Sequence, residues 1–109
     1  MSKDYQTLLT ERGIELSDLG FKESALRRAD ALQAIGLLQK DLIPILGGDV
    51  YYYQDSKKAF AYAGWHCEPN AGEDIQAFSS RSCAKAAEYI SQFPDSAGKE
   101  PIFVLVIRK

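Results

Sequence analysis

The chain has 109 residues, a length typical of one domain, and its 46% hydrophobic and 26% charged residues are ordinary for a folded protein and argue against disorder. A formal net charge of −2, from 13 basic and 15 acidic residues, argues against nucleic-acid binding, because phosphate contacts need clustered lysine and arginine. No stretch approaches the ~20 apolar residues of a membrane span, and no apolar run follows the first residues. We therefore expect a cytoplasmic protein without a signal peptide.

The first forty residues predict two helices. Residues 3–12 have apolar side chains at helical spacing and end at Gly13, a residue suited to closing a helix. Residues 14–21 are expected to form a connector. Residues 22–39 are predicted to form the main amphipathic helix, because one face of it collects apolar side chains, namely Leu26, Ala29, Leu32, Ile35 and Leu38.

The middle of the chain predicts a β-hairpin. Residues 42–53 and 59–67 are β-prone, and a polar, turn-like stretch connects them. Gly47 and Gly48 interrupt the first strand, and a glycine pair inside a strand usually marks a bulge, a bend or a close backbone approach. Asp49 follows the pair. We expect its carboxylate to bond backbone amides at the bend, with contact to a partner as the alternative.

The last third predicts a helix and a buried strand. Ser79 or Ser82 can cap the helix, which ends near Ile90. Residues 102–107 are continuously apolar and β-branched, a pattern that suits a strand inside the sheet with both faces covered. Together the elements predict an α+β fold, in which residues 1–109 form one domain with a small, mainly antiparallel sheet and helices packed on it.

Signatures of catalysis and of metal binding are few. The chain has no phosphate-binding loop, nucleophile elbow or paired histidine motif. Its single histidine, His66, leaves few routes to a catalytic pair. Together with Cys67 and Cys83 it provides too few ligands for a zinc ion, and the spacing of the three residues matches no recognised zinc motif. We therefore expect no metal and no cofactor. Because a cytoplasmic protein keeps its thiols reduced, both cysteines are expected to be buried free thiols.

An acidic and aromatic segment is the best candidate for a partner-binding surface. Residues 59–80 contain three acids and neither lysine nor arginine. Tryptophan and tyrosine are enriched at interface hot spots, and carboxylates steer a basic partner. For Trp65 a core position is favoured over an interface position, and Glu73 and Asp74 could equally be solvated loop acids or favourable charges near a helix N-terminus. The candidate partner-binding residues are Tyr62, Trp65, His66, Glu68, Glu73 and Asp74.

Short motifs occur in a distinctive order along the chain. Gly47-Gly48-Asp49-Val50-Tyr51 is followed by Gly64-Trp65-His66-Cys67-Glu68, by Gly72-Glu73, and by Ser79-Ser80-Arg81-Ser82 at the start of a helix. In this order and at this spacing, the set resembles a family of small immunity proteins that bacteria make beside polymorphic or contact-dependent toxins. Each such protein protects its producer by binding the toxin domain. The resemblance covers roughly residues 24–107.

The resemblance implies an immunity protein of a contact-dependent growth inhibition system. It would bind the toxic C-terminal domain of a cognate bacterial toxin and neutralise it by stoichiometric occlusion, without catalysis. A nuclease is the expected toxin, because a nuclease holds phosphate with lysine or arginine that an acidic loop could cover. We expect neither nucleic acid nor membrane as a partner, and a monomer or weak homodimer when free. Alternatives from other classes are a small ligand-binding or regulatory α+β domain, with the glycine bend and tyrosines as its pocket, and a hydrolase.

Overall fold

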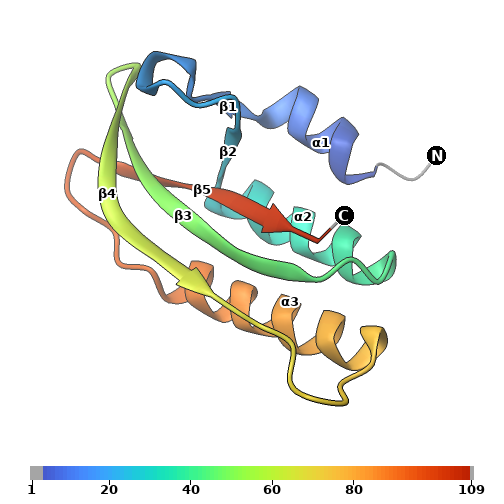
Figure 1. Cartoon of the computed structure of the whole chain (residues 1–109). Helices are drawn as coiled ribbons and strands as arrows, with labels where there is room; N and C mark the ends of the chain where they lie inside the picture. The colour runs from blue at the N-terminus through green and yellow to red at the C-terminus, as the bar shows by residue number, and fades with distance from the viewer. Residues whose placement is uncertain (1–3, 109) are drawn as a thin grey trace.

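Three helices and a five-stranded antiparallel sheet make up residues 4–108, the part of the chain that this computed structural model describes (Figure 1). The strand order is β1-β2-β5-β3-β4, so β4 forms one edge of the sheet. The predicted α+β class, with helices packed on an antiparallel sheet, is confirmed. In chain order the elements are α1 (Tyr5–Arg12), β1 (Ile14–Glu15), the 3₁₀ turn η1 (Ser17–Leu19), β2 (Ser24–Arg27), α2 (Arg28–Lys40), β3 (Ile45–Gln54), β4 (Lys57–His66), α3 (Ile75–Gln92) and β5 (Glu100–Ile107).

The main hydrophobic core lies between the helices and one face of the sheet. Helices α2 and α3 pack against each other behind the sheet, and α1 packs against α2 and β2 (Figure 1). Burial of apolar surface at roughly 25 cal/mol per Å² holds these layers together. The buried residues of this core include Leu8 of α1, Ala34, Ile35 and Leu38 of α2, Cys83, Ala86 and Ile90 of α3, and Leu26, Ile45, Val50, Phe103 and Leu105 of the sheet.

The opposite face of the sheet is covered over only part of its area. A second, smaller cluster forms where β1, η1 and the turn after it fold over the sheet, and it buries Leu16, Ala25, Tyr51, Ile102 and Val104. The β3–β4 part of this face is exposed, as the side chains of Phe60 and Tyr62 show. We call this part the open face and define it by the exposed residues Asp49, Phe60, Tyr62 and Gly64 and by Tyr51, which is buried where the open face meets the smaller cluster.

Helix α1 coincides with the predicted N-terminal helix over residues 3–12, of which residue 3 lies outside the described part of the chain. The helix begins after Asp4, whose carboxylate accepts a hydrogen bond from the Thr7 backbone N–H at 2.8 Å. It ends at Gly13, as predicted, and the glycine N–H donates to the Leu9 carbonyl oxygen at 2.8 Å.

The helix predicted over residues 22–39 is wrong at its start, because residues 24–27 form β2 and α2 begins at Arg28. Leu26, assigned by its spacing to the helix, pairs instead with Phe103 of β5. The neighbouring side chains of β2 are buried on opposite faces, Ala25 in the smaller cluster and Leu26 in the main core. With both faces covered, the strand lacks the alternation that would distinguish it from a helical turn. The expected connector also contains β1, the partner of β2.

Helix α3 is capped by Asp74 and not by either predicted serine. The Asp74 carboxylate accepts a hydrogen bond from the Ala77 backbone N–H at 2.8 Å, and the helix starts one residue after the cap. Ser79 and Ser82 lie inside the helix and are fully buried. Ser82 Oγ accepts a hydrogen bond from the Ile45 backbone N–H at 3.0 Å, so this serine joins α3 to β3.

The hairpin and the final strand agree with their predictions. β3 and β4 pair through a tight turn in which Asp55 and Ser56 adopt left-handed backbone conformations. β5 lies inside the sheet between β2 and β3, and its side chains enter both clusters alternately, Ile102 and Val104 in one, Phe103 and Leu105 in the other. No helix within residues 4–108 is long and apolar enough to cross a membrane.

Candidate functional site

The glycine pair of β3 lies against the end of β4 that carries Trp65. The pairing of β3 with β5 shifts register between Ile45 and Gly47, and Gly47 has a φ of +153°. A Cβ atom on Gly47 would lie 2.4 Å from the Trp65 carbonyl oxygen. A Cβ atom on Gly48 would lie 2.3 Å from the indole ring and 2.4 Å from the Val104 carbonyl oxygen. Both positions therefore require glycine, because the indole and two backbones approach them closely.

Trp65 faces the helices and packs against the main core. Its ring centroid is 4.8 Å from that of Tyr89 of α3, and its indole lies over Gly48. The indole nitrogen is buried and has no hydrogen-bond partner among residues 4–108. This packing agrees with the core position that the sequence favoured for this residue.

The acids of the loop after β4 bond within the chain. Glu73 accepts hydrogen bonds from Arg81 Nε and Nη2, each at 2.8 Å, and from the Asn70 backbone N–H at 2.9 Å. These charge-assisted bonds, the Arg81 bonds above all, lower the pKa of Glu73 to about 2. Asp74 caps α3, and Glu68 Oε1 lies 3.0 Å from His66 Nε2 at the surface. Glu68 is thus exposed, whereas the Glu73 side chain is largely covered.

Basic residues of α3 offset the charge of this loop. Arg81 Nη2 donates to the Glu68 carbonyl oxygen at 2.6 Å, and Lys85 Nζ donates to the His66 carbonyl oxygen at 2.5 Å. Both cations follow the segment 59–80, whose sequence contains no basic residue. The folded loop is therefore less negative than its sequence indicates.

The thiols of Cys67 and Cys83 are buried and not joined by a disulfide, as predicted. Arg81 Nη1 lies 3.4 Å from the Cys67 sulfur. Burial raises the pKa of the Cys83 thiol. Among residues 4–108, no three side chains of His, Cys, Asp or Glu come together in a group able to hold a metal ion.

Tyr62 stands on the open face, at a bulge in β4. The pairing with β3 passes from Val50–Ala63 directly to Tyr51–Phe60, which leaves Ala61 and Tyr62 without partners. Tyr62 has a φ of +54° and is 90% exposed. A left-handed backbone is unusual for an aromatic residue and costs roughly 1–3 kcal/mol.

Four aromatic rings form a continuous row across the open face. Phe60 and Tyr62 stack with centroids 5.7 Å apart, and the Tyr51 centroid is 5.7 Å from that of Phe60. Phe21, from the turn before β2, lies 6.0 Å from both Tyr51 and Phe60. Burial, followed by the charges of Asp49 and Glu23, raises the pKa of the Tyr51 hydroxyl, so two carboxylates act on this row.

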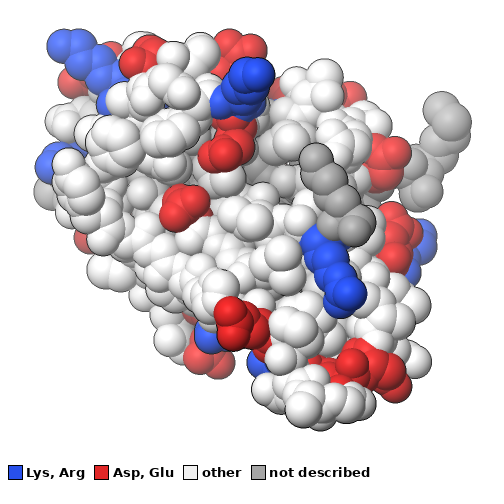
Figure 2. Space-filling view, in the orientation of Figure 1, with Lys and Arg blue, Asp and Glu red and all other residues white. Residues whose placement is uncertain are grey.

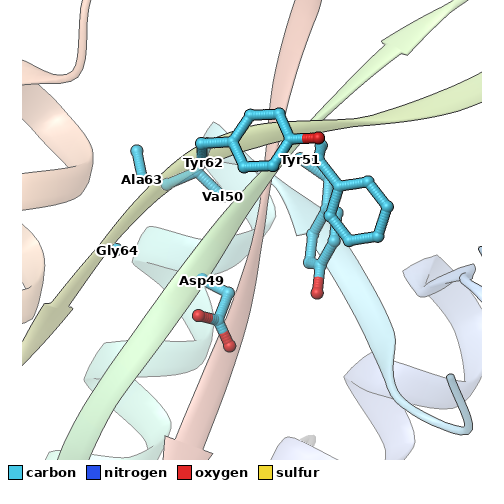
Figure 3. A pocket seen from close by; sticks show the side chains of 7 residues that line it. Asp49, Val50, Tyr51, Tyr62, Ala63 and Gly64 are labelled. Atoms are coloured by element: carbon cyan, nitrogen blue, oxygen red, sulfur yellow. The ribbon is translucent and has the colours of Figure 1, made fainter.

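A cavity of about 260 Å³ opens between the bulge and Asp49 (Figure 3). Asp49 is the only charged residue in its lining, and within residues 4–108 its carboxylate makes neither a hydrogen bond nor an ion pair. The expected bond to backbone amides is therefore absent. The reason is that β3 pairs with β4 on one side and β5 on the other, so the backbone groups at the bend already have partners. Figure 2 shows the wide uncharged surface of this side of the molecule, with most charges around its border.

Comparison with protein families gives one match, in which the model of Immunity protein 40 (Imm40) covers residues 15–107. The chain belongs to the Imm40 family. The match runs from Glu15, the second residue of β1, to the last residue of β5, and so includes α2, α3 and all of the sheet except Ile14. Comparisons with curated proteins and with solved structures found no match.

Membership of Imm40 confirms the predicted immunity family. Immunity proteins of polymorphic toxin systems bind cognate toxins and inhibit them without catalysis, so this Imm40 protein is not an enzyme. The six candidate partner-binding residues of this protein do not form one cluster. Tyr62 lies on the open face. Trp65 lies behind it against α3, His66 ends β4, and the loop that follows contains Glu68, Glu73 and Asp74.

Sequence reasoning did not select the neighbours that surround Tyr62 in the Imm40 fold. Phe60 and Tyr51 join it in the aromatic row, and Phe21 arrives from a distant part of the chain. The alternation of Phe60 and Tyr62 along one strand was the available signal. No sequence signal predicts the bulge that directs Tyr62 into solvent, because neither of its two unpaired residues is glycine or proline.

Proposed function

We propose that this Imm40 protein binds the toxic C-terminal domain of a cognate bacterial toxin in the cytoplasm of the producing cell and neutralises it by stoichiometric occlusion. The observation that carries the proposal is the family match over residues 15–107. Its toxin would belong to a contact-dependent growth inhibition system. The free protein would be a monomer or weak homodimer, with neither nucleic acid nor membrane as a partner.

The size and character of the open face suit occlusion. A standard interface covers about 800 Å² of each partner, which is roughly one-eighth of the 6655 Å² surface of this protein. Exposed aromatic side chains such as Tyr62 and Phe60 provide large contact areas with little loss of side-chain entropy. These exposed rings of the β3–β4 hairpin therefore suit the centre of such an interface.

Among the predicted contact residues, Tyr62, His66 and Glu68 are exposed and neither cap a helix nor pack in the core. In this proposal they contact the toxin directly. The other three, Trp65, Glu73 and Asp74, position the strand and loop that carry these contacts.

We propose a nuclease as the toxin on grounds of charge complementarity. A nuclease binds phosphate through lysine and arginine, so its active site is basic. This protein has a net charge of −2, presents Asp49 beside the exposed rings of Phe60 and Tyr62, and carries Glu68 at the surface beside His66. Opposite charges also accelerate association, which matters when a toxin must be captured quickly.

The test is a binding experiment with the C-terminal domain of the large secreted protein encoded next to this gene. Calorimetry should give a one-to-one complex, and one equivalent should abolish cleavage of DNA or RNA by that domain. A second equivalent should add nothing, since occlusion is stoichiometric. No complex at micromolar concentrations would contradict the proposed function. A complex with a domain that cleaves neither nucleic acid would contradict the nuclease assignment alone.

A further inference from the structure

Asp49 differs from the acids that the fold uses internally. It lies in the middle of a ten-residue strand, is exposed, and bonds to no group within residues 4–108. The strand on one side of it contributes Gly64, directly opposite in register and without a side chain. A Cβ atom on Gly64 would lie 3.3 Å from Asp49 Oδ1, so the glycine leaves the carboxylate accessible from the cavity.

At three places in this protein, an arginine that pairs with a carboxylate also lies over an aromatic ring. Arg81 pairs with Glu73 and lies 5.5 Å from the Phe78 ring centroid. The same combination recurs twice. Arg27 pairs with Glu100 over Tyr53 at 5.6 Å, and Arg28 pairs with Asp95 over Phe103 at 5.8 Å. At Asp49 the carboxylate and the rings are present, but no lysine or arginine lines the cavity.

On the basis of the proposed function, we propose that the cavity between Asp49 and Tyr62 receives one arginine side chain of the toxin. Its guanidinium pairs with the Asp49 carboxylate and packs against the rings of Tyr62 and Phe60. The cavity has a volume of about 260 Å³ and is open to solvent. That volume accommodates a guanidinium group with its neighbouring methylenes.

Arginine fits this cavity better than lysine. A guanidinium is planar, stacks on aromatic faces, can bond both carboxylate oxygens and is more weakly hydrated than an ammonium group. The stacked pair of Phe60 and Tyr62, with an interplanar angle of 27°, offers flat ring surface beside the acid. A single carboxylate is also too few ligands for a metal ion.

The backbone of Tyr62 gives independent support. Its φ of +54° is strained for an aromatic residue, and its side chain gains little from burial because it is 90% exposed. Strain of this kind is common at ligand clamps and binding sites, and at Tyr62 neither a turn nor a helix end accounts for it. A bulge that directs this ring beside the cavity therefore serves the bound guanidinium more than the fold.

The first experiment compares Asp49→Asn with Asp55→Asn in binding to the toxin domain. Both changes remove one negative charge from an exposed site of the same hairpin, and Asp55 stands at the turn, away from the cavity. Loss of the charge pair should weaken the complex about tenfold or more for Asp49→Asn. The control should stay within about twofold. Equal affinities would overturn the arginine site while leaving toxin binding intact.

The second experiment needs no toxin and so separates the two proposals. Backbone amide NMR resonances of the free protein are followed during titration with Nα-acetyl-arginine methylamide and with its neutral isostere, Nα-acetyl-citrulline methylamide. The arginine compound should shift the resonances of Asp49, Tyr62 and Gly64, and Asp49→Asn should remove the effect. Identical shifts with citrulline, or none with arginine, would overturn the site even if the wild-type protein binds the toxin.

Discussion

The two faces of the β3–β4 hairpin are built on opposite principles. Toward the helices, Gly48 and Trp65 pack so closely that no further atom fits between them. On the open face, Tyr62 is exposed on a strained backbone and Asp49 has no partner within residues 4–108. Within one strand pair, the inner face is closely packed and contributes to stability, and in our proposal the outer face contributes to binding. Substitutions should therefore separate the two properties cleanly.

The largest effect is expected at Gly48. In Gly48→Ala the new Cβ would meet both the indole ring and the Val104 backbone, as described above. We expect a loss of about 3 kcal/mol in the free energy of unfolding, measured by urea denaturation. Gly36→Ala in α2 is the control, because nothing lies within 4 Å of its new Cβ. That variant should gain up to ~1 kcal/mol. A Gly48→Ala protein as stable as the wild type would mean that the inner face is loosely packed.

Trp65→Ala should cost stability without changing recognition. Removing an indole that packs on Tyr89 and covers Gly48 should lower the free energy of unfolding by about 2 kcal/mol. The rate of toxin dissociation should stay within about twofold of the wild type, since the ring faces the helices. A much faster dissociation with an unchanged melting curve would move Trp65 to the interface.

Tyr62→Gly should weaken toxin binding without lowering the stability of the fold. Glycine relieves the left-handed backbone, which offsets the lost stack with Phe60, so the free energy of unfolding should be unchanged or up to ~1 kcal/mol higher. Toxin binding should weaken about tenfold or more. Leu42→Gly is the matched control, because Leu42 has a φ of +56° beyond the end of α2. It should gain about 1 kcal/mol and bind normally.

The smallest effect is expected in acid, at the loop. The pKa of Glu73 is lowered from 4.5 to about 2 in the folded protein, so its stabilising contribution is complete above pH 4.5 and is lost as the pH falls towards 2. In Glu73→Gln the urea midpoint should therefore fall less steeply across this window than in the wild type. Glu68→Gln is the matched control, because it removes a carboxylate of the same loop whose side-chain contact, with His66, lies at the surface. Parallel curves for Glu73→Gln and wild type would contradict the internal role of Glu73.

The elements predicted best from the sequence have strong local signals. β5 was placed inside the sheet because its apolar run needs cover on both faces, and the hairpin was found because polar turn residues separate two β-prone runs. β2 was missed because it is four residues long and buried on both faces, so its pattern merges with the following helix. Local patterns identify an element only when length or alternation sets it apart.

The candidate site was harder to predict because partners come from distant positions. Arg81 neutralises Glu73 across the loop, which no count of charges over residues 59–80 could show. The Asp49 carboxylate was expected to bond backbone amides at the glycine bend, because the sequence does not indicate that β3 has a neighbouring strand on each side. The sequence therefore identified the hairpin that carries Asp49 and Tyr62, but it could not distinguish an acid bonded within the fold from one exposed on its surface.

The bulge in β4 also bears on the solubility of the free protein. β4 is an edge strand, and a regular edge of ten residues would be a template for pairing with a second copy or for aggregation. The two unpaired residues at the bulge divide this edge into residues 57–60 and 63–66, each shorter than the usual strand of about five or six residues. The irregularity that tilts Tyr62 outward thus also shortens the edge that a neighbouring strand could extend.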